Sequence, residues 1–315
     1  MATVSNSKTA KQSDSAKAAG LHTIFEDAGV YINPLTDFGF KRLFGTEANR
    51  DLLMDFLNAV LDIDGGIKDL QFRNTEKQGR VKTDPKVVFD LHCITGKDER
   101  IIIEMQKLPQ EYYRDRALYY ASFPIQEQGE KRKNRKKWNY MLYPVYSVNI
   151  VNFKLNKTRK AQKYTSYIQL MDRDTCEVFY DKLTFVYLEL PRFNKKDDEL
   201  DTGVEHWMYV LKHLSNLNDL PATLHSRIFK KLFEQAKIAN MSKEEMNDYQ
   251  QSLKNYRDMY LIEDEWKKKL ATERKALAAK DKRLAAKDKI IEERNKALQK
   301  ALARIAELER KFGIN

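Results

Sequence analysis

The stretch VKTDPKVVFDLHCITGKDERIIIEMQK, residues 81–107, carries the clearest structural signal in the chain. It holds two runs of β-branched and apolar residues, separated by the turn residues Gly96, Lys97 and Asp98. This pattern is typical of a β-hairpin. We therefore predict two neighbouring strands joined by a tight turn.

Each predicted strand places one acid among apolar neighbours: Asp90 in VVFDLHC and Glu104 in IIIEMQ. Side chains two positions apart share a face of a strand, so His92 points the same way as Asp90, and Gln106 the same way as Glu104. A buried carboxylate is costly unless another group compensates for its charge. A hard divalent cation such as Mg²⁺ compensates well, because it prefers oxygen ligands. The two acids therefore indicate a Mg²⁺ or Mn²⁺ site; the alternative is that each simply pairs with a nearby lysine or arginine.

Outward from the hairpin, four zones differ in composition. Residues 1–20 are small, polar and dotted with lysine, and we expect them to be disordered. Residues 21–215 combine prolines, glycines and apolar runs, as a globular α/β domain does, with a helix over 49–61. Apolar residues then return every three or four positions, which predicts a helical extension over 216–260.

The last zone, residues 261–315, contains no proline and no glycine before Gly313 and is predicted to be a long charged helix. One position in seven is always apolar: Leu270, Leu277, Leu284, Ile291, Leu298, Ile305 and Phe312. The companion position four residues later is mostly polar: Arg274, Asp281, Asp288, Asn295, Leu302 and Glu309. A strong coiled coil needs both positions apolar. A homo-oligomer formed through this helix and a solvated single helix held by charge pairs both remain open.

Composition limits the function classes. Lysine and arginine number 57 against 46 acids, a net charge of +11, which favours a polyanionic partner such as nucleic acid or merely aids solubility. No apolar run approaches the roughly 20 residues that span a bilayer, and the N-terminus holds no apolar block of a secretory signal. Only two cysteines occur, Cys93 and Cys176, so neither a disulfide framework nor a zinc cluster is expected. We expect a cytoplasmic protein with no membrane partner.

Several motifs in a fixed order resemble the PD-(D/E)XK nuclease family transposases, which are related to the recombination-promoting nucleases. The resembling segments are NPLTDFGFKRLFG (33–45), LLMDFLNAVL (52–61), VVFDLHC, IIIEMQK, YYRDRALYYASF (112–123), LELPRFNK (188–195) and HWMYVL. The resemblance covers residues 30 to 215. It implies an α/β fold with a PD-(D/E)XK restriction-endonuclease-like core, a mixed central sheet flanked by helices, followed here by the helical region and the long C-terminal helix.

The resemblance also assigns roles. Asp90 takes the place of the first acid of the motif and Glu104 that of the second. Gln106 stands where the wider superfamily usually has a lysine. A lysine could help deprotonate the attacking water, whereas a neutral amide only hydrogen-bonds to it, so Gln106 leaves catalysis open to question. Lys107 is predicted to face the other side of the strand.

Other residues are candidates near this site. Arg116 and Tyr120 share one face of the helix after Glu104, and are predicted to contact a nucleic-acid backbone or to pack against the core. Asp37 is predicted to be an N-cap, with a third acidic metal contact as the alternative. His92 is an accessory ligand candidate, or a packed histidine.

The run GEKRKNRKKWNY, residues 129–140, gathers basic residues around an aromatic one. Such a segment suits phosphate neutralisation and base stacking, or is a solvated basic loop. The candidate phosphate-binding side chains are Lys131, Arg132, Lys133, Arg135, Lys136 and Lys137.

Together these features predict a metal-dependent DNA endonuclease that hydrolyses phosphodiester bonds, acting in transposition, recombination or defence against foreign DNA. The metal is predicted to be held by Asp90, Glu104 and the backbone carbonyl of Met105, with Gln106 positioning the water. The alternatives are a catalytically inactive DNA-binding module of the same fold, or an oligomerising interaction protein.

Overall fold

The computed structural model describes residues 29–77, 87–132, 139–156 and 163–313. The contacts within the chain divide it into two units, Met1–Arg257 and Asp258–Asn315. The first unit contains the sheet and most of the helices, and the second holds the continuation of helix α7 (Lys243–Phe312). The arm over residues 1–20, predicted to be disordered, lies outside the described residues.

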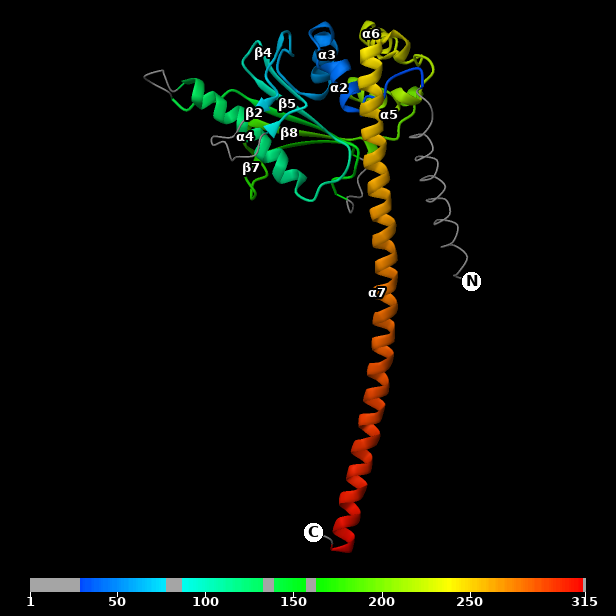
Figure 1. Cartoon of the computed structure of the whole chain (residues 1–315). Helices are drawn as coiled ribbons and strands as arrows, with labels where there is room; N and C mark the ends of the chain where they lie inside the picture. The colour runs from blue at the N-terminus through cyan, green and yellow to red at the C-terminus, as the bar shows by residue number, and fades with distance from the viewer. Residues whose placement is uncertain (1–28, 78–86, 133–138, 157–162, 314–315) are drawn as a thin grey trace. The chain divides into compact units, whose positions relative to one another are not determined.

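A mixed sheet of six strands, in the order β1-β4-β5-β6-β8-β7, forms the centre of the first unit (Figure 1). Its strands are β1 (Leu70–Phe72), β4 (Leu91–Thr95), β5 (Arg100–Gln106), β6 (Val145–Val151), β7 (Thr165–Met171) and β8 (Val178–Glu189). The predicted hairpin is the antiparallel pair β4–β5. Strands β5, β6 and β8 run parallel to one another, and β1 and β7 add antiparallel edges. Two short strands, β2 (Glu76–Lys77) and β3 (Val87–Val88), pair separately.

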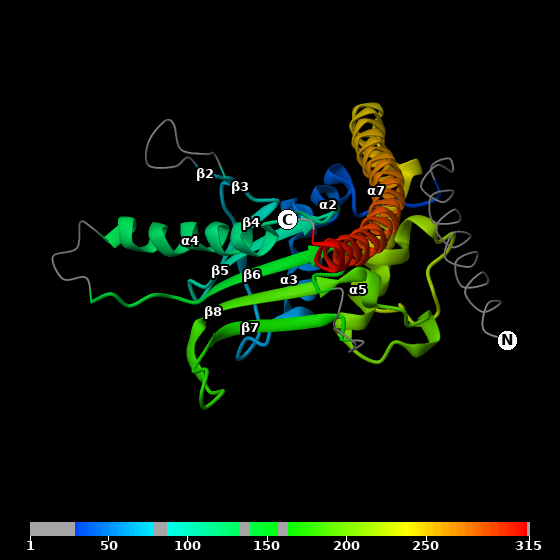
Figure 2. The same ribbon diagram turned by 90° about the horizontal axis from the view of Figure 1, so that it is seen from below.

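Helix α4 (Tyr113–Arg132) connects β5 to the parallel strand β6, because parallel neighbours need a crossover connection. Figure 2 shows it running alongside the strands. Ala121 of α4 packs into a buried cluster with Phe89 and Ile102. The helix continues past residue 123, where the resembling segment ends, and includes Pro124.

A group of helices lies beside the sheet: α2 (Asp37–Phe44), α3 (Arg50–Val60), α5 (Gly203–His213) and α6 (Arg227–Ala236) (Figure 1). Trp207 of α5 is fully buried. The centre of its ring lies 5.5 Å from the ring centre of Phe44, 5.6 Å from that of Phe56 and 5.0 Å from that of Phe229. Its Nε1 donates a hydrogen bond of 2.8 Å to Asp55. This aromatic centre joins α2, α3, α5 and α6.

The first turns of α7 belong to the first unit and are bonded to the segment around α2. The Tyr249 hydroxyl accepts a hydrogen bond from the Asn33 amide at 2.9 Å, and Ser252 Oγ accepts one from the Phe38 amide at 3.1 Å. Tyr249 is buried. The start of α7 is therefore part of the globular unit.

The predicted architecture is confirmed: a mixed sheet flanked by helices, then a helical region and a long C-terminal helix. Within the described ranges, no helix is both long enough and apolar enough to cross a bilayer.

Candidate active site

The β4–β5 hairpin places Asp90 and Glu104 next to each other. Leu91 of β4 faces Ile103 of β5, so Asp90, one residue before β4, stands at the next position, opposite Glu104. The Asp90 side chain reaches across to this strand, because its Oδ2 accepts a hydrogen bond of 2.7 Å from the Met105 amide. The prediction that the two carboxylates meet on neighbouring strands rests on local register alone, and the structure shows them at matched positions.

Glu104 is an unusual buried acid, with only 4% of its surface exposed. Its Oε2 accepts a hydrogen bond from Arg116 Nη2 at 3.1 Å, whereas its buried Oε1 has no hydrogen-bond partner among the described residues. Burial and the nearby Asp90 raise the pKa of Glu104 to about 8, against the opposing effect of Arg116. The site therefore holds a carboxyl oxygen that the protein leaves unsatisfied.

Asp90 is also held in an environment that disfavours its charge. Burial raises its pKa, and the negative charge of Asp37 adds to this effect, while the Met105 amide and the ammonium of Lys41 oppose it. A carboxyl group whose pKa is raised by burial and by a second carboxylate beside it, as that of Glu104 is, is a recognised mark of a functional site.

Arg116 connects the acidic pair to the rest of the site. Besides Glu104, its Nη1 donates to Gln106 Oε1 at 3.2 Å and to Gln110 Oε1 at 2.7 Å. The guanidinium lies 5.0 Å from the centre of the Tyr120 ring. Arg116 thus contacts both Glu104 and Gln106, and helix α4 brings both Arg116 and Tyr120 to the acidic pair.

Gln106 has both polar atoms of its amide engaged by the protein. Its Nε2 donates to the Leu108 carbonyl at 3.0 Å, and its oxygen accepts from Arg116. A lysine has no acceptor atom and could not hold Arg116 in this way. The glutamine at this position is therefore matched to the arginine beside it.

Asn149 lies beside Glu104 and is a residue that the sequence analysis missed. Glu104 of β5 faces Asn149 of β6 in the parallel register, and Asn149 is fully buried. The Tyr113 hydroxyl donates to Asn149 Oδ1 at 3.0 Å, and Asn149 Nδ2 donates to the Ser147 carbonyl at 2.9 Å. Its only sequence signal is a polar residue in the apolar run VNIV, which does not say which strand it will face.

Lys107 follows the last residue of β5, where strand alternation no longer fixes the direction of a side chain. Its ammonium lies 5.8 Å from the centre of the Tyr256 ring. Burial lowers its pKa, and the charges of Asp37 and Asp90 oppose that shift. Lys107 is therefore within electrostatic reach of Asp90, although strand alternation assigned it to the other face.

Asp37 is not the N-cap of α2, which corrects the prediction. The cap is Thr36, whose hydroxyl oxygen accepts a hydrogen bond from the Gly39 amide at 3.0 Å. Asp37 is the first helical residue and pairs with Lys41 at 3.1 Å, a common place for an acid because of the helix dipole.

His92 is buried in β4, and its Nδ1 lies 3.3 Å from the Asn74 carbonyl oxygen. Its ring also packs edge-on against Phe89, with the ring centres 5.6 Å apart. These contacts are those of a packed histidine.

The predicted basic run falls largely outside the described residues. Lys133, Arg135, Lys136 and Lys137 lie there, whereas Lys131 and Arg132 form the end of α4, without described side chains.

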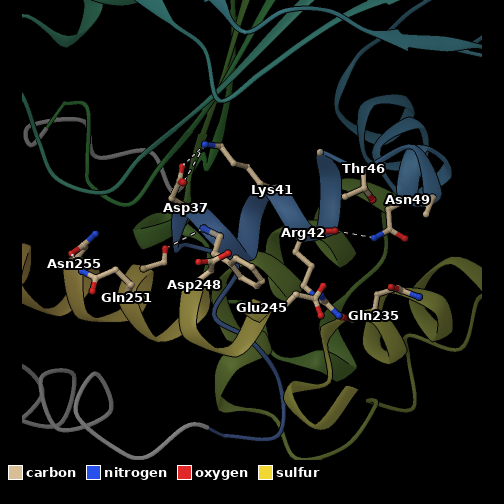
Figure 3. Close-up of a pocket in the computed structure, with 14 residues that line it drawn as sticks. Asp37, Lys41, Arg42, Thr46, Asn49, Gln235, Glu245, Asp248, Gln251 and Asn255 are labelled. Atoms are coloured by element: carbon tan, nitrogen blue, oxygen red, sulfur yellow. Dashed lines mark hydrogen bonds and ion pairs between the residues drawn. The ribbon is translucent and has the colours of Figure 1, made fainter. Parts of the chain in front are cut away.

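A cavity of about 730 Å³ lies between α2, α6 and the start of α7 (Figure 3). Both of its cations are paired with acids of its own wall: Lys41 with Asp37, and Arg42 with Glu245. The described residues that line the cavity therefore offer no uncompensated positive charge to a phosphate.

The acidic pair fits a hard divalent cation in its chemistry. It supplies two carboxylates, and Glu104 has one oxygen without a hydrogen-bond partner among the described residues. The two negative charges repel each other, and a bound cation would offset this repulsion. Within the described ranges, however, no group of three or more His, Cys, Asp or Glu side chains gathers to hold a metal ion. Mg²⁺ commonly uses one or two carboxylates and completes its shell with water and substrate oxygens, so two acids suffice.

A mixed sheet flanked by helices, with one acid on each side of its antiparallel hairpin, is the arrangement of PD-(D/E)XK nuclease-fold proteins. The chain belongs to the PD-(D/E)XK nuclease family transposases, whose family model matches residues 34–265. This confirms the resemblance inferred from the motifs. Neither the comparison with curated proteins nor that with solved structures gave a match.

Proposed function

We propose that this chain is a metal-dependent endonuclease that hydrolyses phosphodiester bonds of DNA, in transposition, recombination or defence against foreign DNA. The observation that carries the proposal is the pair Asp90 and Glu104, at matched positions of the β4–β5 hairpin, together with a buried Glu104 oxygen that has no hydrogen-bond partner among the described residues. A purely structural acid pair would be expected to have all its buried oxygens satisfied.

Asp90 and Glu104 would hold Mg²⁺ or Mn²⁺, together with the Met105 carbonyl. A bound ion lowers the pKa of a coordinated water and stabilises the charge that develops on the phosphate. Asp90 contributes a fixed orientation, because one of its oxygens is bonded to the Met105 amide. Glu104 contributes Oε1, to which none of the described residues donates a hydrogen bond.

Arg116 would position Glu104 and bind a phosphate. The Arg116 side chain is 31% exposed, so the guanidinium can reach solvent while its Nη2 remains hydrogen-bonded to Glu104. The exposed contact with Gln110 can be exchanged for a phosphate oxygen, which is a stronger acceptor. Gln106 and Tyr120 then keep the guanidinium plane in place, and Gln106 or an adjacent water carries the hydrogen bond to the nucleophile.

DNA as the substrate is supported by the family and by the net charge of +11. In the proposal the run from Lys131 to Lys137 neutralises backbone phosphates of the bound DNA.

The test is nicking of supercoiled DNA with Mg²⁺ or Mn²⁺ by the wild type, Asp90→Asn and Glu104→Gln. Asparagine still accepts the Met105 hydrogen bond, so the hairpin is kept while a ligand charge is removed. We expect both variants to lose about a hundredfold or more in rate, since a metal ligand contributes several kcal/mol. Asp115→Asn is the matched control, because Asp115 is an exposed acid on α4 next to Arg116. Equal nicking by the wild type and Asp90→Asn would remove the assigned site.

A second candidate is a DNA-binding module of this fold without catalysis. Gln106 favours it, because both of its polar atoms are already bonded inside the protein. This candidate predicts DNA binding that weakens steeply with salt, survives Glu104→Gln and is never accompanied by metal-dependent cleavage.

A further inference from the structure

The second unit of the chain exposes one row of apolar side chains along its helix. Within Asp258–Asn315, every seventh residue from 270 to 305 is leucine or isoleucine, and none of these side chains is buried. Leu277 and Leu284, for example, are 59% and 60% exposed. At 1.5 Å per residue the helix beyond Asp258 is roughly 80 Å long, so the row is extended. Apolar side chains at a strict period of seven match one of the two seam positions of a helix that packs against another helix.

The residues of this row occupy one of the two seam positions of a heptad, the d position. The other seam position, a, lies four residues after each d and is polar in the first half: Arg274, Asp281, Asp288 and Asn295. Charged a positions usually weaken a coiled coil unless the partner helix compensates for them.

In the first half of the helix, the residue immediately before each charged a position carries the opposite charge. Glu273 precedes Arg274, Lys280 precedes Asp281, and Lys287 precedes Asp288. These preceding residues occupy the g position, which flanks the seam. Within the described tail helix none of these six side chains takes part in an ion pair, although other charges of the same helix do, such as Lys267 with Glu263.

In two parallel helices in register, each a side chain inserts beside the g side chain of the partner. Arg274 would then meet Glu273 of the second copy, Asp281 would meet its Lys280, and Asp288 its Lys287. These side chains form no ion pair along the single described helix. An identical parallel helix would supply an oppositely charged partner for each of them.

We propose that residues 261–312 form a parallel, in-register coiled-coil homodimer whose register is set by these three a–g charge pairs. This inference is independent of the nuclease function. Leu298, Leu302 and Ile305 supply the apolar end of the seam, because both seam positions are apolar there.

An antiparallel pair fits the charges poorly. It would set the g positions of the two helices against each other, and three of the four g positions in this half, Lys280, Lys287 and Arg294, are basic, against the single acid Glu273. The parallel pair has its own cost, since Arg274, Asp281 and Asp288 each face their own copies at the a positions. The dimer is therefore weak and depends on salt.

Sedimentation equilibrium of the full chain tests the association. We expect a reversible dimer, and Asp288→Lys should raise its dissociation constant about tenfold, because the change replaces two attractive contacts with repulsive ones. Combining it with Lys287→Asp reverses the pair and should restore association. Glu293→Lys is the matched control, because it makes the same charge change at the f position, away from the seam, and should leave the constant unchanged.

Oxidative cross-linking of the full chain tests the direction. The exposed Cys176 is first replaced by serine, and the buried Cys93 is kept. In this background Leu277→Cys and Leu298→Cys should each form a disulfide with its own copy, while Ala279→Cys, on the outer face, should not. An antiparallel pair brings at most one d position opposite itself, so cross-linking at only one of the two sites would overturn the parallel arrangement.

A chain that stays monomeric at every accessible concentration would also overturn the proposal. A dimer whose dissociation constant is unaffected by Asp288→Lys would overturn it as well. So would tail substitutions that change DNA binding but not the dissociation constant of the dimer, because the tail helix would then contact DNA and not a second copy.

Discussion

The guanidinium of Arg116 and the carboxylate of Glu104 lie 3.1 Å apart, from Nη2 to Oε2, while the second oxygen of the same carboxylate is buried without a partner in the described structure. One half of this acid is compensated by the protein and the other half is not. The stability of the metal-free fold should therefore depend on whether Glu104 is protonated.

The first prediction concerns pH. The folded chain keeps the Glu104 proton up to a pKa of about 8, whereas the ordinary value is 4.5. Between these values the folded state holds a proton that the unfolded chain has released, so this group makes the free energy of unfolding fall as pH rises. Glu104→Gln removes the effect. We expect the difference between wild type and variant to change by up to about 4 kcal/mol between about pH 5 and pH 9, measured by urea denaturation.

Saturating Mg²⁺ should oppose this loss at high pH, because the ion needs the deprotonated carboxylate. A wild type whose stability runs parallel to that of Glu104→Gln at every pH would contradict the assigned burial.

The second prediction concerns Arg116. Arg116→Ala should raise the pKa of Glu104 further, because the largest opposing charge is lost. Mn²⁺ binding, measured by calorimetry over a pH series, should then require a higher pH. The pH that Arg116→Lys requires for Mn²⁺ binding should lie between those of the wild type and Arg116→Ala. An ammonium keeps the positive charge, but it cannot span Glu104 and Gln106 as the planar guanidinium does. Arg114→Ala, on an exposed part of the same helix, should leave the pH midpoint of Mn²⁺ binding unchanged.

The third prediction concerns the aromatic centre of the helices. Trp207→Phe removes the hydrogen bond to Asp55 and leaves space among Phe44, Phe56 and Phe229. We expect a loss of about 2 kcal/mol in the free energy of unfolding. Trp266→Phe is the matched change at a residue that is 65% exposed, and should cost less than about 0.5 kcal/mol. Equal losses from the two substitutions would refute the role given to Trp207.

The fourth prediction concerns the start of α2. Thr36→Ala should lower stability by about 1 kcal/mol, because it removes the acceptor for the Gly39 amide. Asp37→Ala should cost less, since its partner Lys41 is exposed. The reverse order in thermal melting would show that Asp37 is the effective cap.

The hairpin and its two acids could be predicted because they depend on neighbouring sequence only. A turn at Gly96, Lys97 and Asp98, with Asp98 at φ 65°, fixes which residues of β4 and β5 face each other. Register then carries Asp90 to Glu104 with no knowledge of the remaining fold. The N-cap of α2 was misplaced by one residue, because threonine and aspartate at consecutive positions are both good caps.

Contacts that bring distant segments together could not be predicted. Asn149 faces Glu104 only because β6 pairs with β5 after the crossover through α4. The bond from Arg116 to Gln106 depends on how that helix lies against the strand. Sequence periodicity placed Arg116 and Tyr120 on one face of a helix, but it did not show that the face meets the acids.

The hydrogen bond from the Met105 amide to Asp90 Oδ2 has a consequence for ligand binding. A free aspartate loses rotational entropy when it binds an ion. Here that loss occurs when the chain folds, so the side chain meets the ion already immobilised, and the affinity of the site is less reduced by ordering.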